Sequence, residues 1–154
     1  QILTSIKYKI KFLIITDISS LTVAFGFMLG RIANFINGEL YGRITEHPIG
    51  IVFPKGGEIP RHPSQLYEAF FEGLFLFFLL MFISTKSNKH GVISGSFLLN
   101  YGLIRFFIEY FRQPDSHMGF VALQLSMGQL LSIPMIIVGL ILLTKSLRKN
   151  EAIS

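Results

Sequence analysis

Four long apolar segments are the feature of this sequence that most limits how the chain can fold. Because a helix that crosses a bilayer needs about 20 mostly apolar residues, each segment is long enough to span a membrane. Their long uninterrupted apolar blocks differ from the alternating pattern of a transmembrane β-barrel, the other structure that satisfies its backbone in lipid. The sequence therefore predicts membrane-spanning helices near residues 13–34, 66–84, 92–111 and 126–144.

The composition also indicates a membrane protein. The 154 residues are 51% hydrophobic and 15% charged, with a mean hydropathy of +0.55, whereas a soluble domain is about 25% charged. With no cysteine, the chain supplies no disulfide, thiolate ligand or cysteine nucleophile. No group of residues has metal-ligand spacing, so we expect no metal and no cofactor. We predict an all-α, polytopic transmembrane helix bundle that forms a single membrane-embedded domain over residues 1–154.

The basic residues predict how the helices are oriented. Three groups of them precede the first segment, separate the second from the third and follow the fourth: Lys7, Lys9, Lys11, Lys86, Lys89, Lys145, Arg148 and Lys149. All these places lie on one side of an up-down-up-down path, which the positive-inside rule makes cytoplasmic. Because the lysines lie in specific loops, the net charge of +5 need not indicate nucleic-acid binding. Loop 38–65 and residues 112–125 are expected outside, in the periplasm if the cell is Gram-negative.

Polar residues inside the apolar segments form helical stripes. Residues three or four apart share a helix face, and the stripes are Arg31 with Asn34; Ser64 with Glu68 and Glu72; and Tyr101 with Arg105, Glu109 and Arg112. A charge at mid-depth costs about 2.5–3.5 kcal/mol on insertion scales. The stripes all end on the outer side, where the positive-inside rule gives no reason for arginines. We therefore expect them to converge on one hydrated cavity, whereas Asp17 has no assignment.

This cavity is expected to bind a phospholipid headgroup. Arginine presents a fixed fork of donors that matches phosphate oxygens, and Glu39, Glu68 and Glu109 would balance the cations of the empty site. Residues 62–68, "HPSQLYE", predict a helix whose first amides favour an anion. His62 beside it is a titratable candidate. The alternative reading is that the arginines only reach toward the interface, the ion pairs are structural and His62 is an ordinary loop histidine.

Three motifs, in order, resemble those of bacterial prolipoprotein diacylglyceryl transferases. They are "GRIANFINGELYGR" at residues 30–43, "RHPSQLYEA" at 61–69 and "NYGLIRFFIEYFRQPD" at 100–115. The resemblance extends from about residue 20 to residue 144. It implies seven spans in the bacterial inner membrane with a cytoplasmic carboxyl terminus. The four spans here match the family's last four, so we expect about three upstream spans, including a His-Gly-Gly segment, to be missing from this chain.

The resemblance implies a transferase. The family moves the diacylglyceryl group of phosphatidylglycerol to the thiol of the lipobox cysteine in a prolipoprotein signal peptide, forming a thioether and releasing glycerol phosphate. Since that thiol belongs to the substrate, a cysteine-free chain is compatible with the reaction. The main alternative is a non-enzymatic subunit that binds or transports anionic phospholipid, and the second is a purely structural bundle.

The resemblance also implies roles for single residues. Arg31 would hold the phosphate, and Arg105 would be a second essential cation near the scissile carbon–oxygen bond. Other residues are expected to shape the headgroup site (Asn34, Asn37, Glu39), to line the same stripe (Tyr101, Glu109, Arg112) or to brace it (His62, Gln65, Glu68). The catalytic set expected is Arg105, His62, Tyr101 and Glu39. The group that takes the thiol proton stays open between His62, Tyr101 and a histidine of the missing segment.

Overall fold

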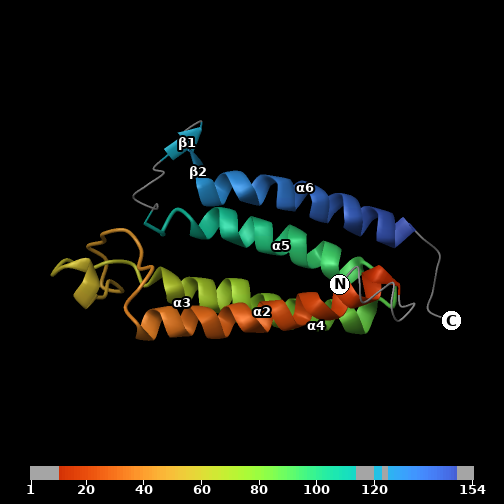
Figure 1. Ribbon diagram of the computed structural model, residues 1–154, viewed down its shortest axis with the longest axis horizontal. Helices are drawn as coiled ribbons and strands as arrows, with labels where there is room; N and C mark the ends of the chain where they lie inside the picture. The colour runs from red at the N-terminus through yellow and green to blue at the C-terminus, as the bar shows by residue number, and fades with distance from the viewer. Residues whose placement is uncertain (1–10, 114–119, 123–124, 149–154) are drawn as a thin grey trace.

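Helices that lie side by side make up most of the computed structural model, which describes residues 11–113, 120–122 and 125–148 (Figure 1). The helical elements are α2 (Phe12–Ile36), the short 3-10 helix η1 (Pro54–Gly56), α3 (Ser64–Glu68), the π-helix η2 (Ala69–Phe75), α4 (Leu76–Lys86), α5 (Val92–Ile108) and α6 (Met127–Arg148). Elements α3, η2 and α4 follow one another without a break and form one rod. Two short strands, β1 (Phe120–Ala122) and β2 (Leu125–Ser126), pair antiparallel before α6. The predicted all-α helix bundle is confirmed.

Three helical rods of the described chain are long and apolar enough to cross a membrane. They are Phe12–Ile36, Ser64–Lys86 and Met127–Arg148, and α5 is a shorter apolar helix. The chain is therefore a multi-pass membrane protein. The predicted segment 92–111 runs past the end of α5 at Ile108, since the next residues form a turn in which Arg112 pairs with Gly42 across an antiparallel bridge.

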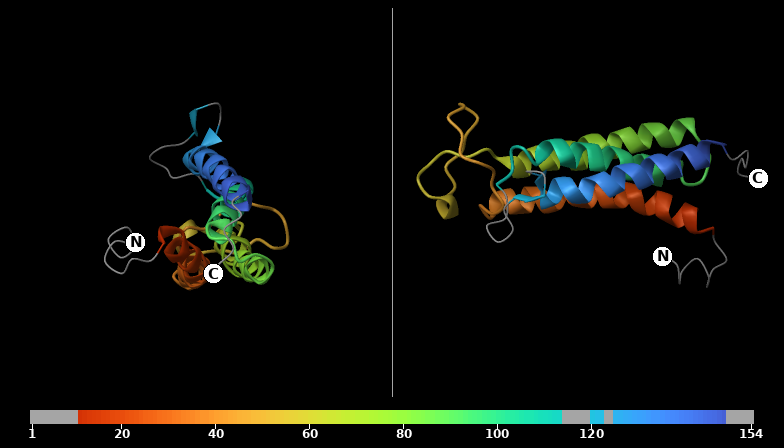
Figure 2. Two further views of the ribbon diagram at one scale, coloured as in Figure 1. Left: turned by 90° about the vertical axis from the view of Figure 1, so that its right-hand side faces the viewer. Right: turned by 90° about the horizontal axis from the view of Figure 1, so that it is seen from above.

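Helix α5 is the centre of the bundle. It packs against α6 on one side and against α2 and the α3–α4 rod on the other (Figure 2). Glycines allow α5 and α6 to approach closely: a Cβ on Gly139 would lie 2.9 Å from the Cα of Leu99, and one on Gly95 2.8 Å from the backbone nitrogen of Leu143. Close packing of this kind is typical of membrane helices, which gain little from burying apolar surface in lipid.

Asp17 joins α2 to the start of α5. Its buried carboxylate accepts hydrogen bonds from the backbone N–H of Gly91 at 2.7 Å and of Ser94 at 2.8 Å, and from the Ser94 hydroxyl at 2.6 Å. These amides belong to the first turn of α5, where N–H groups have no partner within the helix and an anion is favoured. Asp17, which had no assignment from the sequence, is thus an N-terminal cap supplied by another helix.

Residues 37–63 fold over the other end of the bundle, called here the loop end. Gly42 donates its N–H to the carbonyl of His62 at 2.8 Å, and Arg43 donates its N–H to the carbonyl of Phe111 at 2.9 Å. A Cβ on Gly42 would overlap both carbonyl oxygens, so this close approach requires glycine. The loop therefore holds together the end of α2, the start of α3 and the turn after α5.

Candidate functional site

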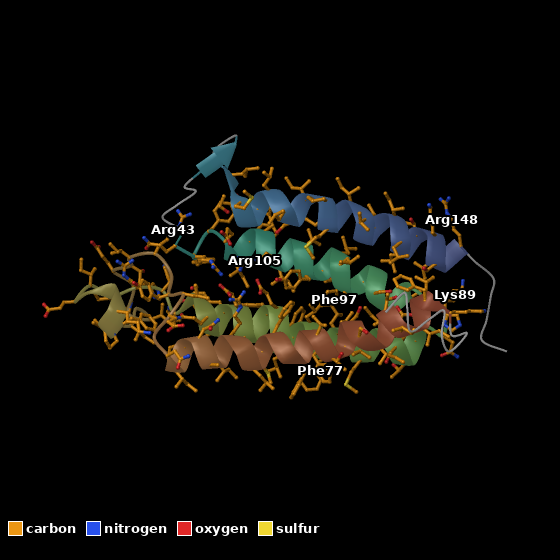
Figure 3. All side chains as sticks on the ribbon, in the orientation of Figure 1. Arg43, Phe77, Lys89, Phe97, Arg105 and Arg148 are labelled. Carbon is orange, nitrogen blue, oxygen red and sulfur yellow. The ribbon has the colours of Figure 1, made fainter. Side chains whose placement is uncertain are left out.

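Three arginines and three glutamates meet at the loop end, between α2, the α3–η2 rod and α5. We call Arg31, Arg105, Arg112, Glu68, Glu72 and Glu109 the charge cluster. The cluster joins the three predicted stripes: Arg31 comes from α2, Glu68 and Glu72 come from the rod, and the others come from α5 and the turn that follows it. Figure 3 shows Arg105 near this end, with its side chain directed toward the rod.

Glu68 is the centre of the cluster. Its carboxylate lies 2.6 Å from Nε of Arg31, 3.5 Å from the nearest guanidinium nitrogen of Arg105 and 3.4 Å from that of Arg112. The side chain has no exposed surface. A fully buried carboxylate is stable only when cations and hydrogen bonds compensate its lost hydration, so Glu68 gathers arginines from two motifs around one point.

Arg105 connects the glutamates. Its guanidinium lies 2.9 Å from Glu109, one turn along α5, and 3.4 Å from Glu72 across the helix interface. Glu109 also accepts a hydrogen bond from the Ser126 hydroxyl at 3.0 Å, and it packs against Gly128. The arginine side chains keep some exposure, 19% for Arg31 and 14% for Arg105, whereas Glu68 and Glu72 have none. An incoming ligand therefore meets the cations first.

A π-helix positions Glu72. The seven residues of η2 follow Glu68 directly and place Glu72 on the face that carries Glu68. Within η2, Gly73 packs against α2, where a Cβ would come within 2.5 Å of the Cβ of Met28. Single π-helical turns are rare and are frequent at functional sites. Spacing placed Glu72 in the stripe with Glu68, but the sequence assigned it no role; its central position appears only in the structure.

His62 lies in a pocket under the loop. Its Nδ1 is 3.2 Å from the Tyr67 hydroxyl, and its ring packs edge-on against Phe111. The pocket has a volume of about 360 Å³, and its other lining residues are His47, Ile49, Phe71 and Ile108. Burial lowers the pKa of His62 below 6.5, and nearby His47 lowers it further. A neutral imidazole at neutral pH is able to accept a proton.

Gln65 and Ser64 fasten the loop to the start of α3. Gln65 is fully buried and donates its side-chain N–H to the backbone carbonyl of Glu39 at 2.6 Å, and the Ser64 hydroxyl donates to the carbonyl of Leu40 at 3.1 Å. These contacts hold the loop on α3, which fits the expectation that Gln65 braces the site. The role of Gln65 stays a prediction. Tyr101 stacks on Phe97 and lies against Phe27, one turn before Arg105 on α5.

The structure separates Glu39 and Asn37 from the charge cluster. Glu39 is exposed and pairs with Lys55 at 2.6 Å, and Asn37 is exposed at the end of α2. Asn34 is partly buried in the last turn of α2, where its carbonyl accepts the N–H of Glu39 at 2.9 Å. The structure thus brings together Arg31, Arg105, Arg112, Glu68 and Glu109 of the predicted site but does not place the side chains of Glu39 or Asn37 among them. Within the described residues, no group of three or more His, Cys, Asp or Glu could hold a metal ion.

Comparisons with known proteins show to which family the chain is related. Residues 1–145 match the family model described as prolipoprotein diacylglyceryl transferase. A protein of Rickettsia felis named phosphatidylglycerol–prolipoprotein diacylglyceryl transferase is 54% identical over 143 residues, which are 91% of this chain and 55% of the relative. A protein of the same name from Idiomarina loihiensis is 51% identical over 135 residues, 88% of this chain and 51% of the relative. The chain spans about half the length of these curated relatives. It belongs to the prolipoprotein diacylglyceryl transferase family.

Proposed function

We propose that this chain is part of an enzyme that transfers the diacylglyceryl group of phosphatidylglycerol to the lipobox cysteine of a prolipoprotein signal peptide. One observation carries the proposal: Arg31 and Arg105, from two separate motifs, contact the same Glu68 carboxylate. Two guanidinium groups held this close together form a site that matches a lipid phosphate. The names of the relatives supply the two substrates.

The chemistry assigns the arginines a purpose. A sulfur–carbon bond forms to the terminal glycerol carbon of the diacylglyceryl group, and the bond between that carbon and the phosphate oxygen breaks. The electron pair goes to that oxygen, so negative charge grows on the leaving glycerol phosphate. Guanidinium groups that contact this charge as it develops lower the barrier, and removing one such donor typically costs about 10²–10³ in rate.

The acceptor thiol must lose its proton to act as the nucleophile. At neutral pH only a few per cent of an ordinary cysteine is thiolate, so the site must accept a proton or stabilise the anion. The cations of the charge cluster would favour the thiolate. For the base, His62 offers a ring nitrogen in a loop-end pocket, and Tyr101 lies one turn from Arg105 on the same helix.

The distribution of basic residues supports an orientation. Lys89 and Arg148 lie at the end of the bundle opposite Arg43 and Arg105, as Figure 3 shows. The loop that carries Lys89 and the end of α6 that carries Arg148 would be cytoplasmic by the positive-inside rule. The charge cluster would then face the periplasmic side of the bacterial inner membrane, where the outer-leaflet phosphate and the exported signal peptide are both accessible.

The test uses the protein at its natural length in vesicles containing phosphatidylglycerol and a lipobox peptide. The expected result is an increase in the mass of the peptide cysteine equal to one diacylglyceryl group, with release of glycerol phosphate. Arg31→Ala and Arg105→Ala should each abolish the product while the protein remains folded. Lipid movement without a thioether would favour a transport subunit and would refute transfer. Unfolding of both variants, together with no product from the unsubstituted protein, would favour a structural bundle.

A further inference from the structure

The charge cluster is electrically balanced before a lipid binds. It holds three guanidinium groups and three carboxylates, which sum to a formal charge of zero. Phosphatidylglycerol brings one more negative charge to this partly buried place. An uncompensated charge in a low-dielectric environment is costly. Binding therefore favours the loss of one negative charge from the cluster.

Glu72 is the carboxylate that the arginines hold least closely. Its nearest cations are Arg105 at 3.4 Å and Arg31 at 4.0 Å. The Oε2 atoms of Glu68, Glu72 and Glu109 all lack a hydrogen bond of good geometry, so the ion-pair distances distinguish them. Oε2 of Glu68 lies 2.6 Å from Arg31 and Oε2 of Glu109 lies 2.9 Å from Arg105, whereas Oε2 of Glu72 lies 4.0 Å from Arg31.

The surroundings of Glu72 make a neutral carboxyl group acceptable there. The charged and titratable groups that face it are Arg31 from α2, Glu68 from α3, and Tyr101 and Arg105 from α5. Both arginines also contact Glu68, and Arg105 contacts Glu109, so neither depends on Glu72 alone. A phosphate that competes for these guanidinium groups would weaken the hold on Glu72 further.

We propose that Glu72 takes up one proton from the medium when the phosphate of phosphatidylglycerol binds. This inference rests on the proposed function, because it requires the lipid phosphate to occupy the charge cluster. Uptake of the proton keeps the formal charge of the cluster at zero and frees the nearest N–H groups of Arg31 and Arg105 for the phosphate. The neutral carboxyl also gains one O–H donor.

The test measures proton uptake directly. Dihexanoyl phosphatidylglycerol is titrated by calorimetry into the natural-length protein in detergent, in buffers of different ionisation enthalpy. At a pH where free Glu72 is ionised, we expect uptake of about one proton per lipid bound, and affinity that falls about tenfold for each further pH unit. Glu72→Gln should bind the lipid with no proton uptake and with affinity that no longer depends on pH.

Glu58→Gln is the matched control. Glu58 is an exposed carboxylate of the loop and does not belong to the charge cluster, so this variant leaves the formal charge of the cluster at zero and should keep the proton uptake of the unsubstituted protein. Infrared difference spectra should show the carbonyl band of a protonated carboxyl group when lipid binds, in the unsubstituted protein and in Glu58→Gln. That band makes the test independent of whether Glu72→Gln folds.

The outcomes separate the two ideas. Lipid binding without proton uptake, or proton uptake that persists in Glu72→Gln, would overturn the inference and leave the proposed function standing. Proton uptake that is lost in Glu58→Gln as well would show that the loss does not depend on a carboxylate of the charge cluster and would also overturn it. Failure of the unsubstituted protein to bind the lipid at all would refute both the phosphate site and the inference.

Discussion

Asp17 of α2 accepts two hydrogen bonds from Ser94 of α5, one from the backbone N–H at 2.8 Å and one from the hydroxyl at 2.6 Å. This contact lies at the end of the bundle opposite the charge cluster. Helices α2 and α5 contact each other, and each supplies one arginine whose guanidinium contacts Glu68. The Asp17 contact thus helps to fix how far α2 and α5 are shifted along one another, which decides whether both arginines reach the same carboxylate.

Replacing Asp17 should destabilise the bundle. Asp17→Ala leaves the N–H groups of Gly91 and Ser94 without their acceptor, and loss of a helix cap or of a buried hydrogen-bond partner costs about 2 kcal/mol. Asp17→Asn keeps an acceptor oxygen and should cost less. Thermal unfolding in detergent measures the effect. Thr22→Ala is the control, since Thr22 is exposed and bonds only within its own helix turn; equal losses in both variants would contradict the role of Asp17.

Adding a methyl group at Gly128 should lower the activity while the helix bundle stays folded. A Cβ at Gly128 would lie 2.6 Å from the carboxylate of Glu109, so Gly128→Ala pushes Glu109 away and loosens its hold on Arg105. Misplacement of a positioning group by about 1 Å can cost about 100-fold in rate. The measurement is kcat/KM for peptide lipidation. Leu131→Ala, on an exposed part of the same helix, should leave the rate unchanged, and a similar loss there would point to general damage.

Arg31 should not be replaceable by lysine. Arg31 contacts Glu68 at 2.6 Å through Nε and reaches toward Glu72 at 4.0 Å through another nitrogen, and a lysine ammonium cannot span both positions. We expect Arg31→Lys to lower kcat/KM by about 100-fold. Arg148→Lys, at the other end of the molecule (Figure 3), should retain full activity. Normal activity of Arg31→Lys would show that a point charge suffices.

The pH dependence of His62 has a defined sign. Burial and His47 lower the pKa of His62 below 6.5. As the pH falls, His62 therefore becomes protonated at a higher pH in the unfolded chain than in the folded protein. The stability that neutral His62 contributes is full above pH 6.5 and falls as the pH drops from there toward its folded-state pKa. Nuclear magnetic resonance of labelled histidine should give a titration midpoint below 6.5.

The variant His47→Asn tests whether His47 contributes to the low pKa of His62. Removing the imidazole of His47 should move the His62 midpoint upward, while the larger effect of burial keeps it below 6.5. Unfolding temperatures measured across the same pH range should lose part of their pH dependence in His62→Gln. A His62 midpoint above 6.5 in the unsubstituted protein would contradict the structure around this residue.

The sequence does not determine where the loop places its side chains. The role of Glu39 in shaping the headgroup site stays a prediction, and in the structure its exposed side chain pairs with Lys55. The chain turns at Gly38 and Leu40, which have φ values of 63° and 57°, and no periodic pattern predicts such left-handed positions in a loop. The Gln65 bond to the Glu39 carbonyl holds this backbone on α3, which leaves the Glu39 side chain on the outside.

The sequence by itself determined the apolar helices and the face of each helix that carries charge. Hydrophobic length and a period of 3.6 residues are local properties, so the stripes of Arg31, Glu68 and Arg105 could be read from spacing alone. Only the tertiary structure decided that Glu68 joins those arginines, that Glu72 lies among them at longer ion-pair distances and that Asp17 caps α5. These pairings depend on the axial shift and rotation of helices that are distant in sequence. Close glycine packing and capping contacts between helices set that shift and rotation, and no local pattern encodes them.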